Sequence, residues 1–276
     1  MDEETGLTLG GTAIAADMMR RVLGPTADYL GDEFRGWVEH RTEEAKRIIE
    51  KARQKQESEP DDEETVPPRV AKGVFEEGPY FDNELGAEYF GGILAASRTN
   101  KRYDDRGSSY VDLISRLSSY QIAVHYLFYK SVRIIYSEND LNLSHEKELS
   151  KIKTFFPLVT LEVNIDLKDA SRDEYNSLLQ HIFFGLLRED LLGSLKWGPK
   201  RDLPYKGNID RNTPGVVFEP TALGISLYLW AHGKGSTDLN RFLDESLDLI
   251  SDIKTDLTSD IQKVKDNEIE CNRIQV

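Results

Sequence analysis

The side chains that most often carry catalysis or bind metal ions are few and scattered in this chain. Its 276 residues include one cysteine, Cys271, and five histidines, none of which has another histidine at i+3 or i+4. His145-Glu146 begins a zincin-like HEKEL segment, but Leu149 stands where the second zinc-binding histidine would be. The sequence therefore predicts no metal site and no bound cofactor. The histidines are His40, His125, His145, His181 and His232.

Motifs for phosphate binding or nucleophilic attack are also missing. Gly233-Lys234-Gly235-Ser236-Thr237 resembles a phosphate-binding loop, but the spacing is wrong and a helix is expected before it, so a helix stop is the better interpretation. We find no G-x-S-x-G turn and no dinucleotide fingerprint. We expect His125 and His181 to be core residues of apolar helices rather than bases. No catalytic residue is predicted, although three scattered acids leave an effector enzyme as a less favoured alternative: Glu88, Asp104 and Asp105.

One segment has the composition of a contact surface. Between residues 196 and 211, five basic residues outnumber two acidic ones, and aromatic residues lie among them. Basic and aromatic side chains together can contact a nucleic-acid backbone, although an ordinary solvated loop has the same composition. The candidate contact residues, for nucleic acid or a protein partner, are Lys196, Trp197, Lys200, Arg201, Lys206 and Arg211.

Composition limits the classes of partner and compartment. The net charge of −14, with most of the excess acid in residues 1–66 and 236–276, opposes a broad nucleic-acid footprint. No run is long enough to span a bilayer, since the best candidate, residues 7–19, is short and contains Asp17. The acidic start does not resemble a secretory signal, and one cysteine needs no oxidising compartment. We expect a cytoplasmic protein without stable membrane insertion.

The elements that would position these residues are mostly helical. An apolar stripe of period 3.6 predicts a long helix from Pro25 to Glu57, followed by an acidic linker. Shorter helices are expected over residues 67–77 and from Asp82, as cap, to Ser97. Gly91-Gly92 inside the second should allow close backbone packing, with a ligand pocket as the alternative.

Residues 110–136, capped by Ser108 or Ser109, are apolar enough for a buried helix broken near Ser118-Ser119. The β-branched content and partial alternation of residues 155–165 predict a strand or extended chain. Ser171 and Glu174 form a capping box that begins another helix.

The order of motifs after residue 171 is typical of a winged-helix module. A helix ending in Gly185-Leu186-Leu187 is followed by a Gly-, Pro- and charge-rich wing. A strand at residues 216–218 then leads into a helix beginning at Thr221-Ala222-Leu223-Gly224. Finally, heptad-like spacing predicts an amphipathic helix over residues 236–269, although Ser246 and Asp260 occupy two seam positions. This helix would pack within the chain or form a homodimer contact.

Five short segments carry a family resemblance: Leu23-Gly24-Pro25-Thr26-Ala27, Pro67-Pro68-Arg69-Val70, Glu76-Glu77-Gly78, Glu84-Leu85 and Tyr89-Phe90-Gly91-Gly92-Ile93-Leu94-Ala95. Together they resemble the Abi-alpha family. Tyr89-Phe90-Gly91-Gly92 departs from the family's usual Trp-Ala helix, and the similarity extends over about residues 20–230. The resemblance implies a role in abortive phage infection, without catalytic residues that could be carried over.

The sequence as a whole predicts a mainly α protein in which a long N-terminal helix and a helical bundle join a winged-helix-like α+β module and a C-terminal amphipathic helix. We expect a non-enzymatic phage-defence protein that acts through contacts with a protein partner or phage component. A winged-helix nucleic-acid-binding regulator is the alternative, and an effector enzyme or a membrane-disrupting toxin is less favoured. The expected segments are a helical N-terminal segment 1–58, an acidic linker 59–66, a helical pair 67–107, the winged-helix-like module 108–235 and the C-terminal helix 236–276.

Overall fold

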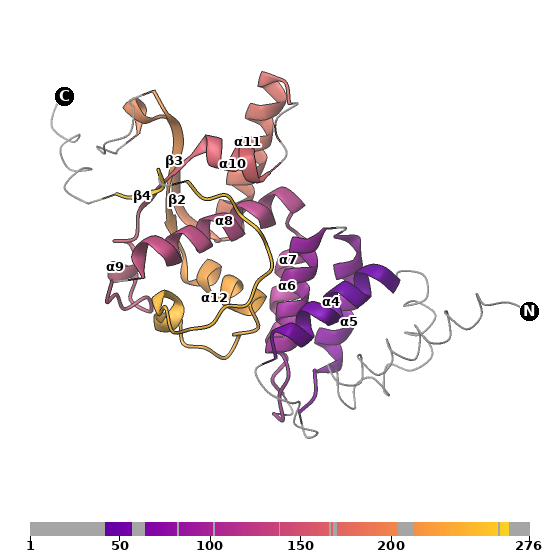
Figure 1. Cartoon of the computed structure of the whole chain (residues 1–276). Helices are drawn as coiled ribbons and strands as arrows, with labels where there is room; N and C mark the ends of the chain where they lie inside the picture. Colours follow the sequence, from indigo (N-terminus) through magenta and orange to yellow (C-terminus); the bar gives the residue numbers. More distant parts are fainter. Residues whose placement is uncertain are drawn as a thin grey trace, which may run out of the picture. The chain divides into compact units, whose positions relative to one another are not determined.

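The computed structural model describes residues 42–56, 64–81, 83–101, 103–137, 139–165, 167, 170–203, 212–258 and 260–264. This part of the chain is mostly helical and includes a small four-stranded antiparallel sheet (Figure 1). It divides into two compact units: the first extends to residue 116 and includes residues 229–236 and 249–252, and the second contains the other residues. No helix among the described residues is long and apolar enough to cross a membrane.

In the described part of the chain, four neighbouring helices build the first unit (Figure 1). The helix predicted from residue 25 is confirmed where the structure describes it, since α4 ends at Gln54, while residues 25–41 lie outside the described part. The expected helix over residues 67–77 is confirmed, since α5 ends at Glu77 and the short 3-10 helix η1 (Gly78–Tyr80) follows it. The helices are α4 (Thr42–Gln54), α5 (Pro68–Glu77), α6 (Glu84–Ala96) and α7 (Gly107–Ser115).

The glycine pair inside α6 lies where two backbones approach the helix. A Cβ on Gly91 would lie 2.8 Å from the carbonyl oxygen of Ile48 in α4. A Cβ on Gly92 would overlap the carbonyl oxygen of Ala231, the last residue of α12 (Ala222–Ala231). Only glycine allows such contact, so the predicted close backbone packing is confirmed.

Some helix boundaries differ from the expected ones. The side chain of Asn83 caps α6, while Asp82, the expected cap, lies outside the described residues. Ser108 lies inside α7, which begins without a side-chain cap because its backbone already turns at Arg106. Thr65, at the end of the expected acidic linker, pairs with Thr99 across an isolated bridge.

A buried group of charges joins α4 and α6. Glu88 of α6 is 0% exposed and accepts a hydrogen bond from the ammonium group of Lys55. Lys51, one turn earlier on α4, lies 3.4 Å from the second carboxylate oxygen of Glu88. The same two lysines hold the later segment of this unit, because Lys55 donates to the carbonyl of Ile250 (2.9 Å) and Lys51 to Asp252 (3.3 Å). Burial lowers the pKa of Lys55, although Glu88 opposes the effect.

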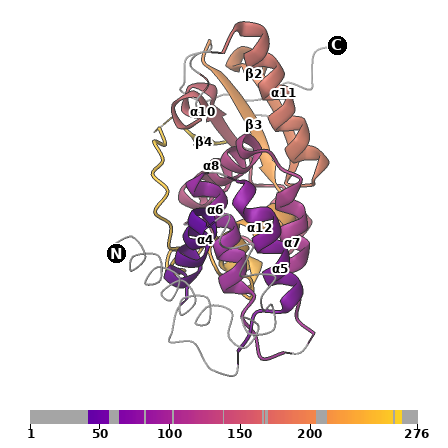
Figure 2. The same ribbon diagram turned by 90° about the vertical axis from the view of Figure 1, so that its right-hand side faces the viewer.

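The second unit contains the sheet and the helices that precede or follow its strands. Its strands are ordered β2-β3-β1-β4, and all neighbours run antiparallel. Helix α11 lies alongside β2 (Figure 2). In chain order the elements are α8 (Ser119–Tyr136), the short α9 (Glu146–Leu149), β1 (Thr154–Pro157), α10 (Leu158–Asn164), α11 (Arg172–Arg188), β2 (Leu192–Pro199), η2 (Lys200–Asp202), β3 (Pro214–Pro220), η3 (Leu239–Leu243) and β4 (Gln262–Lys263).

The core of this unit centres on Phe128 of α8. Its ring is stacked on Phe218 of β3 with centroids 4.0 Å apart, and it lies 5.1 Å from Phe156 of β1 and 6.4 Å from Phe183 of α11. One side chain therefore contacts two strands and a second helix. The opposite face of the sheet is covered by a separate buried cluster: Phe155, Leu203, Val217 and Val264.

Hydrogen bonds of Tyr129 and Thr221 fix the turn from α11 into β2 and the start of α12. The Tyr129 hydroxyl donates to the carbonyl of Leu191 (2.7 Å) and accepts from the backbone N–H of Thr221 (3.0 Å). Thr221 in turn caps the helix, since its Oγ1 accepts from Gly224 N (3.0 Å). A Cβ on Gly224 would overlap the Tyr129 hydroxyl, and one on Gly185 would overlap the side chain of Gln121. The glycines of both expected motifs therefore lie at tight packing points.

Of two predictions from the second half of the sequence, one is confirmed only in part and the other is wrong. Residues 155–165 are only partly extended, because β1 ends at Pro157 and α10 begins at Leu158. The C-terminal helix expected over residues 236–269 is absent from its described part, which contains η3, an extended stretch and β4. The described residues therefore do not contain the helix through which a homodimer contact was expected.

The C-terminal segment is extended because other elements of its unit supply its hydrogen bonds. The side-chain amide of Asn164 donates to the carbonyl of Asp256 and accepts from its N–H, both at 2.9 Å. Thr160 bonds Thr258 (2.9 Å), and β4 pairs with the edge of β1. Ser246 and Asp260 at the expected seam positions weaken the apolar face that a helix would need. The contacts with Asn164, Thr160 and β1 supply hydrogen bonds that a helix would otherwise make.

The charge cluster yields a stability prediction. Glu88→Gln leaves the buried ammonium group of Lys55 without its ion-pair partner, so we expect the free energy of unfolding in urea to fall by about 3–5 kcal/mol. Adding Lys55→Met should recover part of this loss. Glu76→Gln removes the partner of Lys72 in an exposed pair (3.6 Å) and should cost less than about 1 kcal/mol. Equal losses in both single variants would contradict a buried cluster.

His125 yields a prediction for pH. It is fully buried, its Nε2–H donates to the carbonyl of Gly224 (3.1 Å), and burial lowers its pKa from 6.5 to about 3. Because the pKa of His125 is lower in the folded state than in the unfolded state, the neutral side chain contributes stability above pH 6.5, and this contribution is lost as the pH falls toward 3. Between pH 7 and 5 the protein should lose about 2 kcal/mol more unfolding free energy than His125→Gln. If urea titrations gave the same pH dependence of the unfolding free energy for the unchanged protein and for His125→Gln, the prediction would be refuted.

Candidate functional site

Helix α11 has one face in the core and one face in solvent. Ser171 and Glu174 form the predicted capping box: the carboxylate accepts from Ser171 N (2.9 Å) and the hydroxyl from Glu174 N. Four side chains then anchor the helix and leave the opposite face open. The buried ones are Leu179, Ile182, Phe183 and Leu186, and the exposed ones include Asn176, Ser177, Gln180, His181 and Phe184.

The exposed face carries an aromatic pair formed by Phe184 of α11 and Trp197 of β2. Phe184 is 55% exposed, and its ring meets the half-buried Trp197 edge to face, with centroids 5.6 Å apart. Trp197 also lies 5.3 Å from the buried Phe183, so the core holds the tryptophan in place. A large apolar ring supported by a fixed neighbour is a typical anchor of protein interfaces.

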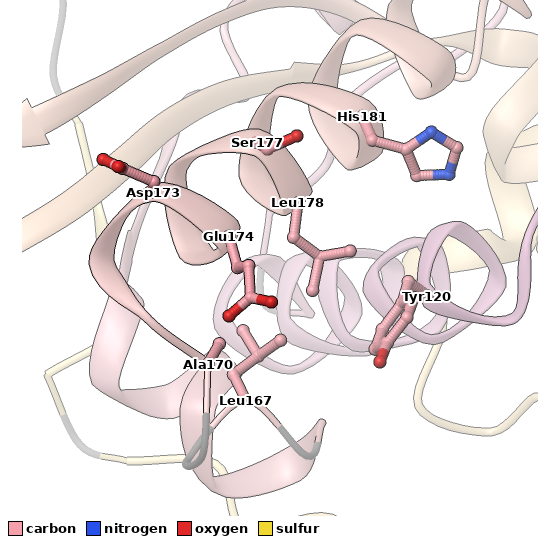
Figure 3. Close-up of a pocket in the computed structure, with 8 residues that line it drawn as sticks. All are labelled: Tyr120, Leu167, Ala170, Asp173, Glu174, Ser177, Leu178 and His181. Atoms are coloured by element: carbon pink, nitrogen blue, oxygen red, sulfur yellow. The ribbon is translucent and has the colours of Figure 1, made fainter.

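An open groove of about 840 Å³ adjoins the N-terminal half of α11 (Figure 3). Its apolar walls come from the start of α8 and from the chain just before α11, as well as from α11 itself. Ser177 and His181 border the groove one helical turn apart, and Phe184 lies three residues further along the helix. The lining residues are Tyr120, Leu167, Ala170, Asp173, Glu174, Ser177, Leu178 and His181. We call the aromatic pair, the groove and the exposed α11 residues between them the α11 surface.

His181 and Ser118 approach each other beside this groove. His181 Nε2 lies 3.0 Å from Ser118 Oγ, a distance at which a histidine can activate a serine nucleophile. Ser118 is, however, the cap of α8, and its Oγ accepts from Gln121 N. Gln121 also donates to the carbonyl of His181 (2.9 Å), so these contacts fasten α11 to α8. The core position expected for His181 is wrong, because the side chain is exposed, whereas that expected for His125 is confirmed.

The structure does not gather the expected wing residues into one patch. Lys196 pairs with Val217 and Trp197 with Val216, so strand alternation places these two side chains on opposite faces of the sheet. Lys200 is only 5% exposed, while Arg201 is exposed and lies 3.8 Å from Asp202. Lys206 and Arg211 lie outside the described residues.

The charge of α11 also argues against a nucleic-acid face. No lysine or arginine occurs between Arg172 and Arg188, and the first turn carries Asp173 and Glu174. A helix that contacts phosphates usually presents several basic residues. The exposed groups on α11 instead combine neutral polar side chains with an aromatic ring, which suits a protein partner.

The acidic residues considered for catalysis each have a basic partner. Arg106 donates to both carboxylate oxygens of Asp104 (2.7 and 2.9 Å), and its hydrogen bond lowers the pKa of that carboxyl. Asp105 pairs with Arg69 (3.3 Å), and Glu88 belongs to the buried lysine cluster. Within the described ranges, no three His, Cys, Asp or Glu residues lie close enough to hold a metal ion.

Comparison with known proteins gives no family assignment. No protein-family model matches the chain, and neither curated proteins nor solved structures give a significant match.

Sequence reasoning missed Phe184 as a surface residue. The signal was present, because Leu179, Ile182, Phe183 and Leu186 define a buried stripe of period 3.6 that leaves position 184 outside. The groove carried no such signal, since its walls come from segments about 50 residues apart.

The two adjacent phenylalanines give a matched stability test. Phe183 is fully buried and Phe184 is 55% exposed. Phe183→Ala should lower the free energy of unfolding by about 3–5 kcal/mol, because it leaves a cavity. Phe184→Ala should cost less than about 1 kcal/mol, since it removes little buried area. Urea titration of both variants measures the difference, and a large loss from Phe184→Ala would show that this ring belongs to the core.

Proposed function

We propose that the second unit is a winged-helix-like module. Two observations support this: the chain order α8-β1-α10-α11-β2-β3, and a sheet in which β3 lies between β1 and β2. In this interpretation α10 and α11 form the helix-turn-helix pair, α11 is the recognition helix, and the connection between β2 and β3 is the wing. Modules of this order bind nucleic acid or only protein, so the surface must decide the partner.

The chain then acts as a non-enzymatic docking protein whose α11 surface binds a partner protein. The observation that carries this proposal is the exposure of Phe184 on the recognition helix. Its large ring is more than half exposed and is supported by Trp197 of β2. Aromatic anchors in the centre of an interface supply much of its binding energy. The absence of lysine and arginine from residues 173–187 favours protein over a phosphate backbone.

The biological role that we propose is phage defence of the abortive-infection type. Its support is the resemblance of the segments around Leu23, Pro67, Glu76 and Tyr89 to the Abi-alpha family. A docking surface without an assembled catalytic site in the described residues suits a protein that detects a phage component, or that releases a toxic partner after infection.

Nucleic-acid binding through the wing is the second candidate. Lys196 and Arg201 support it, because both are exposed beside the wing. The net charge of −14 and the acidic first turn of α11 oppose it. A salt-dependent shift of DNA mobility with purified protein, abolished by Lys196→Glu/Arg201→Glu, would favour this candidate over protein docking.

The test of the proposed function is a phage challenge of a bacterial host that expresses the protein. We expect fewer plaques on the expressing host, with death of infected cells, and loss of this protection in Phe184→Ser. Because Phe184 contributes little to the core, the variant should fold normally, which circular dichroism and urea titration can check.

The matched control is Ile134→Ser, which changes another exposed apolar residue of the same unit. Ile134 of α8 is 57% exposed, so the two substitutions remove similar exposed surface. Protection should survive Ile134→Ser. Equal plaque counts with and without the protein across a broad phage panel would contradict the defence role, and full protection by Phe184→Ser would contradict docking through α11.

A further inference from the structure

The groove beside α11 has apolar walls and an aromatic side. Leu167 is buried, Leu178 is half-buried, and Tyr120 exposes more than a third of its surface. Leu178 points toward the Tyr120 ring in Figure 3. Such walls suit an aliphatic chain, and the exposed tyrosine ring can lie against a planar or cationic group.

Two carboxylates give the groove its charge. Glu174 lines it, and hydrogen bonds from Ser171 to the carboxylate lower the pKa of Glu174, so the group is ionised at neutral pH. Asp173, which is exposed, stands at the rim (Figure 3). Among the lining residues that the structure describes there is no lysine or arginine, and His181 is hydrogen-bonded to Ser118.

The capping box fixes the position of the Glu174 carboxylate. One of its oxygens, Oε2, accepts from Ser171 N, and this contact orients the group. A carboxylate has about four acceptor sites, so it can take further hydrogen bonds from a ligand. Guanidinium groups are the cations that best combine hydrogen bonding to a carboxylate with stacking on an aromatic ring.

We propose that this groove binds an arginine side chain presented by an apolar segment of a partner protein. The aliphatic stem of the arginine lies between Leu167 and Leu178, its guanidinium group reaches Glu174, and the Tyr120 ring forms the other side of the groove (Figure 3). Apolar neighbours of the arginine cover the outer part of the groove. This inference rests on the proposed docking function of the α11 surface and adds the chemistry of the partner.

Position 174 allows a substitution that separates charge from structure. Glutamine at the third helical position also completes a capping box, so Glu174→Gln keeps the helix start and removes the charge. A purely structural role for Glu174 would leave ligand binding unchanged in this variant.

The experiment titrates the full chain with the blocked peptide Leu-Leu-Arg-Leu-Leu and with its isosteric, uncharged citrulline analogue, followed by calorimetry and by amide NMR shifts. We expect the arginine peptide to bind about tenfold more tightly than the citrulline peptide, with shifts at Tyr120, Leu178 and His181. Glu174→Gln should weaken the arginine peptide about tenfold and leave the citrulline peptide unaffected, while Ile134→Ser should change neither affinity.

Equal affinity of the two peptides, shifts elsewhere on the protein, or unchanged arginine binding by Glu174→Gln would each overturn the proposal. The outcome is distinguishable from failure of the proposed function, because the titration involves no phage. Phage protection that depends on Phe184, without peptide binding, would contradict arginine binding in the groove and leave the proposed function standing. Peptide binding without phage protection would contradict the defence role and leave the groove proposal standing.

Discussion

The stacking of Phe128 on Phe218 is the contact on which the second unit depends. It places α8 against the central strand of the sheet, and the same ring reaches Phe156 of β1 and Phe183 of α11. The orientation of α11 follows from this cluster, because Phe183 must enter it. Tyr129, the next residue of α8, then fixes the end of α11 by accepting from Thr221 and donating to Leu191. Ring packing and one buried hydroxyl thus determine which side of α11 faces solvent.

The proposed function uses the residue that this packing leaves outside. With Phe183 in the core, the helical rotation of about 100° per residue brings Phe184 to the edge of the buried stripe, where Trp197 supports it. A ring held in this way loses little conformational freedom when a partner covers it, which favours binding. In the first unit, the buried Lys51, Lys55 and Glu88 stabilise helix packing.

Sequence periodicity predicted most of the helices and the strand-to-helix turn at Thr221, because local chemistry determines these features. The Ser171–Glu174 capping box and the close packing at Gly91-Gly92 are examples. It failed for residues 236–264, where a heptad-like spacing was outweighed by bonds from Asn164 and by the edge of β1. The six expected contact residues were chosen by composition, and strand alternation separated Lys196 from Trp197. Contacts between distant segments, such as the groove walls, leave no local signal.

The claim that the α11 surface docks a protein is tested most directly by placing a photo-crosslinking amino acid at position 184, with position 134 as the control. Irradiation of phage-infected cells should give one discrete protein adduct at position 184 that is absent from position 134 and weaker in the chain that also carries Glu174→Gln. Adducts to nucleic acid at position 184, or the same protein adducts at both positions, would contradict the account.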